Sequence, residues 1–171
     1  MNYCAIYKQD IINGLGVRVS LFVSGCTHKC PGCFNQKAWN ENYGKEYTQE
    51  TEDLIMEYLK EPYIDGLSLL GGEPMEVTHQ KDICKLVTRV RKELPEKNIW
   101  LYSGYTLEEL TSDKVKTEFT DTILRSIDVL VDGEFSQAQK DVELPFRGSS
   151  NQRLIAMKRT MNSDHVYTLE L

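Results

Sequence analysis

Apolar residues recur along the chain in two alternating patterns. Short runs of aliphatic and β-branched residues, each closed by glycine or a polar turn, are typical of buried strands. Longer stretches between them place apolar residues three and four positions apart, which predicts amphipathic helices. Strands are expected at 17–23, 66–70, 98–102, 128–132 and 153–156, and helices after Thr48, at 79–94, around 107–110 and around 119–126.

The two longest predicted helices carry their own start and stop signals. Thr48 is a candidate N-cap, and Pro62 lies beyond the end of the helix that it would begin. Pro95 stops the helix predicted over 79–94. One face of the first helix is expected to carry Leu54, Ile55, Tyr58 and Leu59.

Strands that alternate with helices and short turns are typical of βαβ units. We therefore predict an α/β fold with a mainly parallel, open sheet. The 171 residues are about half to two-thirds of what a complete eight-stranded barrel needs, so an incomplete (β/α) barrel is expected. One domain is expected over 1–171, with no structural assignment for the tail 158–171.

Polar motifs follow four of the predicted strands. Cysteines come after the first strand and Gly71–Pro74 after the second, while Ser103-Gly104 and Asp132-Gly133 follow the next two. Ligands of parallel α/β sheets bind at the carboxyl ends of the strands. All four motifs are therefore expected at one edge of the sheet.

Composition and charge narrow the classes of partner. The net charge of −6 argues against a nucleic-acid backbone as ligand, because phosphate binding needs clustered Lys and Arg. No apolar run approaches the roughly 20 residues that span a bilayer, and the first residues do not read as a signal peptide. A cytoplasmic protein without membrane contact is expected.

Three of the five cysteines lie within eight residues. Cys26, Cys30 and Cys33 have C-x3-C-x2-C spacing, whereas Cys4 and Cys84 stand alone and are expected to be small buried residues. Closely spaced thiolates suit an iron–sulfur cluster or zinc. Structural zinc normally has four ligands, and only His28 lies close enough to replace a fourth cysteine.

A cluster with three protein thiolates has one iron without a protein ligand. That iron can take a small molecule that carries an amine and a carboxylate, such as the methionine end of S-adenosylmethionine. From spacing alone, the loop 26–33 could hold a [4Fe–4S] cluster or a zinc ion.

The motifs together resemble the radical S-adenosylmethionine superfamily. Within it, the chain is similar to the activating proteins of anaerobic (class III) ribonucleotide reductases, and the similarity covers roughly residues 10–157. The passages that carry the resemblance are Cys26–Asn35 with Trp39, Leu70–Pro74, Tyr102–Gly104, Val131–Phe135 and Arg147–Gln152.

The resemblance implies a role for the glycines of the second turn. The backbone at Gly71 and Gly72 would receive the amino group of S-adenosylmethionine, with Glu73 either contacting the ligand or stabilising the turn. Adenine would lie near Gly32, Cys33 and Phe34. This chain has Gly32 where many members of the superfamily have an aromatic residue.

The remaining candidate residues have an alternative structural interpretation. Ser103 and Asp132 either contact the carboxylate or ribose of the ligand or cap the segments that follow them. His28 is expected to pack over the cluster or to hydrogen bond near it, and Trp39 to pack in the core. Arg147–Gln152 is either a surface loop or a docking segment. No side chain is assigned as catalytic, because the cluster and cofactor perform the chemistry.

The resemblance also implies the reaction and its partners. A one-electron donor, expected to be flavodoxin, would reduce the cluster, and S-adenosylmethionine would be cleaved to a radical that acts on a glycine of the large reductase subunit. Three alternatives stay open. The first is a radical enzyme with another target, which could be a different glycyl radical enzyme or a small molecule. The second is a zinc-stabilised interaction module without catalysis, and the third is an electron carrier.

Overall fold

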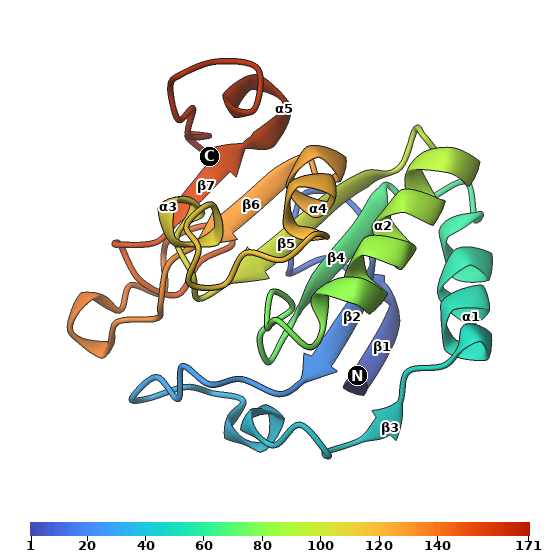
Figure 1. The fold of residues 1–171 in the computed structure, drawn as a ribbon, viewed down its shortest axis with the longest axis horizontal. Helices are drawn as coiled ribbons and strands as arrows, with labels where there is room; N and C mark the ends of the chain where they lie inside the picture. The colour runs from blue at the N-terminus through green and yellow to red at the C-terminus, as the bar shows by residue number, and fades with distance from the viewer.

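The computed structural model describes all residues from 1 to 171. Strands and helices alternate along most of the chain (Figure 1). The strands are β1 (Asn2–Asp10), β2 (Arg18–Ser24), β3 (Lys45–Glu46), β4 (Gly66–Gly71), β5 (Asn98–Ser103), β6 (Val129–Asp132) and β7 (Arg153–Ala156). The helices are α1 (Gln49–Leu59), α2 (Gln80–Glu93), α3 (Leu107–Leu110), α4 (Thr120–Ser126) and α5 (Met157–Thr160), with short 3-10 turns η1 (Gln36–Trp39) and η2 (Gln137–Gln139).

All seven strands form one open sheet in the order β3-β1-β2-β4-β5-β6-β7. Parallel pairing joins β2, β4, β5 and β6, whereas β1, β3 and β7 pair antiparallel with their neighbours. The α/β class and the open sheet are confirmed. The predicted dominance of parallel pairing holds only for the four central strands, and the predicted incomplete barrel is not confirmed, since the strands form one open sheet of mixed parallel and antiparallel pairing.

The predicted strands and helices are present, with boundaries shifted by one or two residues. Two strands, β1 and β3, were absent from the prediction, so the cysteines follow the second strand of the chain and not the first. β1 is half exposed along most of its length and lacks the continuous apolar run that marks the central strands. The signal that would have identified it is therefore weak.

The helix α1 begins as its sequence predicts. The Thr48 hydroxyl accepts a hydrogen bond from the backbone N–H of Thr51, and the Thr51 side chain accepts one from the Thr48 backbone. The predicted face is wrong at Leu54, which is 42% exposed. Ile55 and Leu59 face the core as predicted, and Met56 lies beside them.

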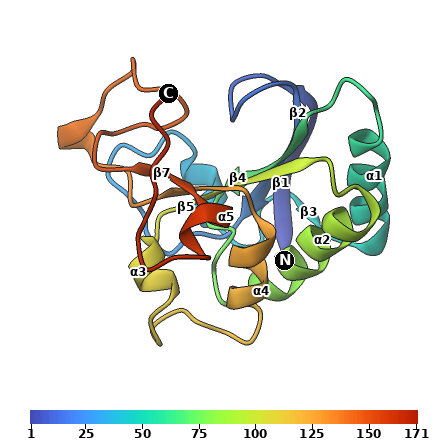
Figure 2. The ribbon, with the colours of Figure 1, turned by 90° about the horizontal axis from the view of Figure 1, so that it is seen from above.

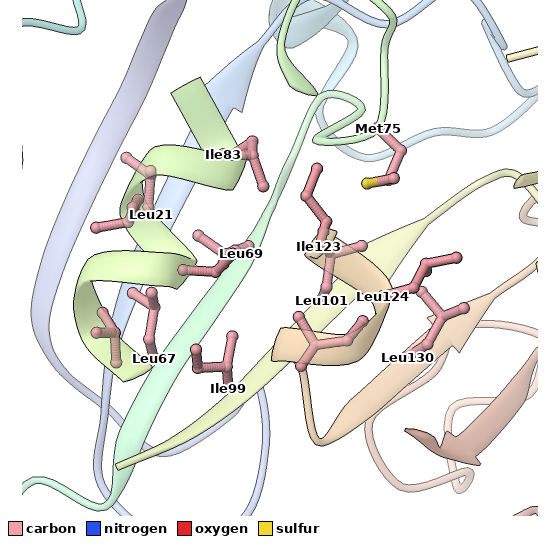
Figure 3. Close-up of a cluster of buried hydrophobic side chains, with 14 of the residues drawn as sticks. Leu21, Leu67, Leu69, Met75, Ile83, Ile99, Leu101, Ile123, Leu124 and Leu130 are labelled. Carbon is pink, nitrogen blue, oxygen red and sulfur yellow. The ribbon is translucent and has the colours of Figure 1, made fainter. Parts of the chain in front are cut away.

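The hydrophobic core lies between the sheet and its helices. Figure 2 shows α1, α2 and α4 along one face of the sheet. Alternate residues of the central strands point into this layer, as period-two geometry requires. The close-up in Figure 3 labels ten members of the core: Leu21, Leu67, Leu69, Met75, Ile83, Ile99, Leu101, Ile123, Leu124 and Leu130.

The chain end that the sequence left unassigned returns to the sheet. The backbone N–H of Ala156 donates to the carbonyl of Tyr167, and that of Leu169 donates to the carbonyl of Leu154. The segment after α5 thus runs beside β7. None of the helices has the length and apolarity needed to cross a membrane.

Candidate functional site

A cavity of about 520 Å³ opens where the central parallel strands end. The turns that follow β2, β4, β5 and β6, called here the rim, come together at this end of the sheet (Figure 1). The cavity is also lined by residues before β2 and by the loop between η2 and β7. The expectation that the four polar motifs share one edge is confirmed by this arrangement.

The cysteine loop begins in a tightly packed position. The N–H of Gly25 donates to the carbonyl of Ala38 at 2.7 Å, and that of Cys26 donates to Trp39 at 3.3 Å. Gly25 has φ +104°, a conformation that residues with a side chain rarely adopt. These contacts fix the direction in which the chain leaves β2 and enters the loop.

The three thiols line the same cavity and are all partly buried. Burial raises the pKa of the Cys26 thiol to about 11, with a contribution from the nearby Glu73 and Glu76 charges. Burial also raises the pKa of Cys30. A metal must therefore displace protons from these thiols when it binds.

The donor set fits an iron–sulfur cluster. Three soft sulfur donors come from one eight-residue loop, and no fourth cysteine lines the cavity. No three His, Cys, Asp or Glu side chains adopt a ready coordinating arrangement in this structure. The fit therefore rests on donor type and shared position and not on an assembled geometry.

The glycines of the second turn allow two rim segments to approach closely. A Cβ on Gly71 would lie 2.6 Å from the Val23 nitrogen, and one on Gly72 would lie 2.4 Å from the Gly25 carbonyl oxygen. Backbone N–H groups of Gly72 and Glu73 donate to Val23 and Gly25 at 2.7 and 2.8 Å. The turn is thus locked to the start of the cysteine loop, with both glycines at the cavity wall.

The Glu73 carboxylate is turned into the protein and is only 1% exposed. It accepts hydrogen bonds from the Met75 N–H and the Ser103 hydroxyl at 2.8 Å, and from the Gly104 N–H at 2.7 Å. A fourth partner, the His28 ring, lies at 3.1 Å. Glu73 lines the cavity, and because these partners occupy both of its oxygens, its side chain joins the rim segments.

His28 lies between two carboxylates. Its Nε2 is 3.1 Å from Glu73, and its Nδ1 is 2.6 Å from Glu134. Burial alone would lower the pKa of His28, but the hydrogen bonds and negative charges of Glu73 and Glu134 outweigh it and raise the pKa to about 9. Both ring nitrogens thus lie within hydrogen-bond distance of a carboxylate, and a protonated ring can donate to both.

The two strand-end candidates have different surroundings. Ser103 lines the cavity, although its hydroxyl donates to Glu73 and accepts from the Tyr105 N–H. Asp132 does not line the cavity. Its carboxylate accepts from the Leu107 N–H at the start of α3 and from the Arg153 guanidinium. The structure thus brings Ser103 to the site and directs Asp132 to the neighbouring helix and strand.

The expected adenine segment lies at the mouth of the cavity. Gly32 has φ +79°, and a Cβ there would lie 2.2 Å from the Gln137 side-chain oxygen. An aromatic residue at this position would be strained by the positive φ and would displace the Gln137 side chain. Phe34 is 92% exposed, so its ring is available at the surface.

Sequence reasoning missed part of the wall. Ile12 and Asn13, in the turn before β2, line the cavity, as do Tyr102 and several residues of 140–148. The Tyr102 hydroxyl and the Arg147 Nε are buried without a hydrogen-bond partner. Tyr102 and the Arg147 segment lie in passages that carry the family resemblance, whereas Ile12 and Asn13 had no signal in the sequence.

Comparison with known proteins gives two concordant results. Residues 12–155 match the family model described as a 4Fe-4S single cluster domain. The anaerobic ribonucleoside-triphosphate reductase-activating protein of Vibrio cholerae is 49% identical over 154 residues, which are 89% of this chain and 96% of the relative. The protein of that name from Escherichia coli K12 is 46% identical over the same shares, and that of Enterobacteria phage T4 is 40% identical over 90% of this chain and 93% of the relative.

These matches cover nearly the whole length of each relative, and the family model includes all three clustered cysteines and the Gly71–Pro74 turn. The chain therefore belongs to the family of anaerobic ribonucleoside-triphosphate reductase-activating proteins.

Proposed function

We propose that this chain holds a [4Fe–4S] cluster on Cys26, Cys30 and Cys33, cleaves S-adenosylmethionine and generates the glycyl radical of an anaerobic ribonucleotide reductase. The observation that carries the proposal is the shared cavity of the three thiols and the Gly71-Gly72 turn. The names of the relatives, activating proteins of anaerobic ribonucleoside-triphosphate reductase, support the reductase as target. Residues 1–171 act as one radical S-adenosylmethionine domain, with 26–33 as the cluster loop.

The bound groups supply the redox chemistry. Held by Cys26, Cys30 and Cys33, the cluster together with S-adenosylmethionine would supply a one-electron cleavage of the carbon–sulfur bond, with methionine, 5′-deoxyadenosine and the glycyl radical of the target as the products. The side chains of this protein position the reactants and need not act as acids or bases.

Different rim residues would position different parts of S-adenosylmethionine. The backbone at Gly71 and Gly72 would receive the amino group of the methionine end, and Ser103 would contact the ligand carboxylate or ribose. Gly32, Cys33 and Phe34 would hold the adenine. Asp132 contributes indirectly through its hydrogen bond to the start of α3.

The target is a protein segment and not a small molecule. Ile12, Phe34 and Val142 line the cavity and are 75%, 92% and 86% exposed. Large apolar side chains gathered at one opening are typical of protein docking surfaces. The sheet serves as an incomplete barrel whose unclosed side admits the large reductase subunit, and flavodoxin supplies the electron.

Anaerobic reconstitution with iron and sulfide tests the proposal. The reconstituted protein is incubated with dithionite and S-adenosylmethionine, and then with the large reductase subunit. We expect methionine and 5′-deoxyadenosine, followed by a glycyl radical signal in the reductase. Cys30→Ala should abolish both products, while Cys84→Ala, a matched change on α2, should retain them.

Each alternative predicts a different result. A colourless zinc protein would overturn the cluster assignment, and a brown protein that forms no 5′-deoxyadenosine would identify an electron carrier. Cleavage without a radical on the reductase would point to another glycyl radical enzyme or a small-molecule substrate.

A further inference from the structure

One side chain of the cysteine loop contacts three of the four rim segments. His28 lies between Cys26 and Cys30, and its side chain is only 6% exposed. Its ring meets Glu73 in the turn after β4 and Glu134 in the segment after β6. It also packs on the Tyr105 ring after β5, with the ring centroids 4.3 Å apart.

The His28 ring fits here only because residue 104 is a glycine. A Cβ on Gly104 would lie 2.6 Å from the His28 Cδ2 and 2.7 Å from its Nε2. The backbone N–H of Gly104 donates to the same Glu73 oxygen that the His28 Nε2 contacts. His28 and Gly104 therefore share one acceptor, and the imidazole occupies the space above the glycine.

Few other hydrogen bonds tie this part of the loop to the protein. The N–H and hydroxyl of Thr27 both donate to Glu76 at 2.7 Å. Lys29, the next residue, has φ +50°, a left-handed conformation that is uncommon outside glycine. The chain thus turns sharply directly after His28, so the position of Cys30 depends on where His28 is held.

The hydrogen bond between His28 and Glu73 links the cysteine loop to the Gly71-Gly72 turn. Glu73 follows the Gly71-Gly72 turn, and its own N–H donates to Gly25 at 2.8 Å. A change in the His28–Glu73 contact would alter the separation between the cysteines and the turn. Glu134, in contrast, has a side chain that is 60% exposed and can follow the ring without strain.

We propose that His28 is a positioning residue that sets the distance between the cluster and the Gly71-Gly72 turn through its hydrogen bond to Glu73. The inference rests on the proposed function, since that turn matters only if it receives S-adenosylmethionine. His28 itself neither binds the cluster nor transfers a proton. Its loss weakens cofactor binding more than cluster assembly.

Three substitutions separate the two hydrogen bonds of the ring. In His28→Gln the side-chain amide nitrogen takes the place of Nε2 and reaches Glu73, whereas in His28→Asn it takes the place of Nδ1 and reaches Glu134. His28→Ala removes both. His165→Ala, a change at an exposed histidine of the C-terminal segment, is the matched control.

The test measures the KM for S-adenosylmethionine, kcat of reductive cleavage and iron content per chain. His28→Ala is expected to raise KM about tenfold, the usual effect of losing one charge-assisted hydrogen bond, with a smaller change in kcat and unchanged iron. His28→Gln should recover most of the affinity and His28→Asn little of it. The change that S-adenosylmethionine causes in the electron paramagnetic resonance spectrum of the reduced cluster should weaken in the same order.

Hydrogen exchange of the cluster-free chain gives a second readout that is independent of activity. Amides of residues 26–35 should exchange faster in His28→Ala than in the parent chain or His165→Ala. Equal exchange in all three would overturn the proposal even if the parent protein is inactive. Active parent protein with an unchanged KM in His28→Ala would overturn it while leaving the proposed function intact.

Two further outcomes would also contradict the inference. Equal loss of iron in all three His28 variants would show that the residue only maintains the cluster loop. Recovery by Asn instead of Gln would assign the effect to Glu134. An active parent protein is the outcome that confirms the proposed function separately.

Discussion

The two faces of the central sheet are built from the same four strands but differ in character at β2 and β4. On the helix side, alternate residues such as Leu69 and Leu101 are aliphatic and fully buried (Figure 3). On the other side, Arg18, Ser20 and Ser68 are equally buried but polar. Burial alone therefore does not distinguish the faces, and the chemistry of the side chains does.

Hydrogen bonds satisfy the buried polar groups of this second face, called here the polar face. The Arg18 guanidinium donates to the Ser68 hydroxyl at 2.6 Å, to Asn98 Oδ1 at 2.7 Å and to the Leu67 carbonyl at 2.8 Å, and it stacks over the Trp100 ring. The same face carries Tyr102 toward the cavity. The comparison teaches that one face stabilises the fold by apolar burial alone, while the other combines directional contacts around Arg18 with a smaller apolar cluster that includes Trp100.

The largest effect on stability is expected on the helix side. Leu69→Ala would leave a cavity in a closely packed layer and lower the free energy of unfolding by about 3 kcal/mol. Leu54→Ala, on the exposed side of α1, should change it by less than about 0.5 kcal/mol. Denaturant unfolding of both variants measures the difference, and equal values would contradict the assignment of the core.

A smaller loss is expected when the polar face is disrupted. Arg18→Met keeps much of the side-chain volume but leaves the acceptors at Leu67 and Asn98 without their donor, at a cost of about 2 kcal/mol. Arg125→Met on the exposed side of α4 is the control. If Arg18→Met were more stable than the parent chain, the network would be less favourable than simple apolar packing.

Low pH should lower the stability of the protein through Asp10, whose carboxylate accepts a hydrogen bond from Ser20 on the polar face. Burial by itself would raise the pKa of this carboxyl, but hydrogen bonds from Asn13, Ser20 and the Ile12 N–H outweigh it and hold the pKa below its ordinary value. The folded-state pKa therefore lies below the unfolded value of about 3.9, so the stabilisation is present above that pH and is lost as the pH falls.

The Asp10→Asn variant tests this sign. It should be less stable than the parent at pH 7 by about 1 kcal/mol, and its stability should decline less steeply below about pH 4. The comparison is thermal or urea unfolding measured across that range, with the exposed Asp113→Asn as control. A parallel pH dependence in parent and Asp10→Asn would contradict the prediction.

The smallest effect on stability is expected at the mouth of the cavity. Phe34→Ser changes a side chain that is 92% exposed, so the free energy of unfolding should shift by less than about 0.5 kcal/mol. Affinity for the large reductase subunit should nevertheless fall about tenfold, because exposed aromatic residues dominate many interfaces. Binding measured by calorimetry would contradict the docking role if the affinity were unchanged.

Much of the central sheet could be predicted because its signals are local. The apolar runs of β4, β5 and β6 end at glycine or polar residues, and the Thr48 cap acts within three residues of itself. The sequence also predicted that the polar motifs gather at one edge, since parallel strands carry the residues after them to the same end. The half-exposed strand β1 and the two-residue, exposed strand β3 have no comparable signal.

The sequence by itself determined the alternation of strands and helices, the spacing of the three thiols and their place after a strand. Only the tertiary structure decided that the Glu73 carboxylate turns inward to His28, Ser103 and Gly104, and that Asp132 binds Arg153 away from the cavity. Periodicity and spacing act over a few residues and can be read directly. The hydrogen-bond partners of these charged side chains lie from about 20 to over 100 positions away in the sequence. They meet only because the folded sheet brings distant segments together.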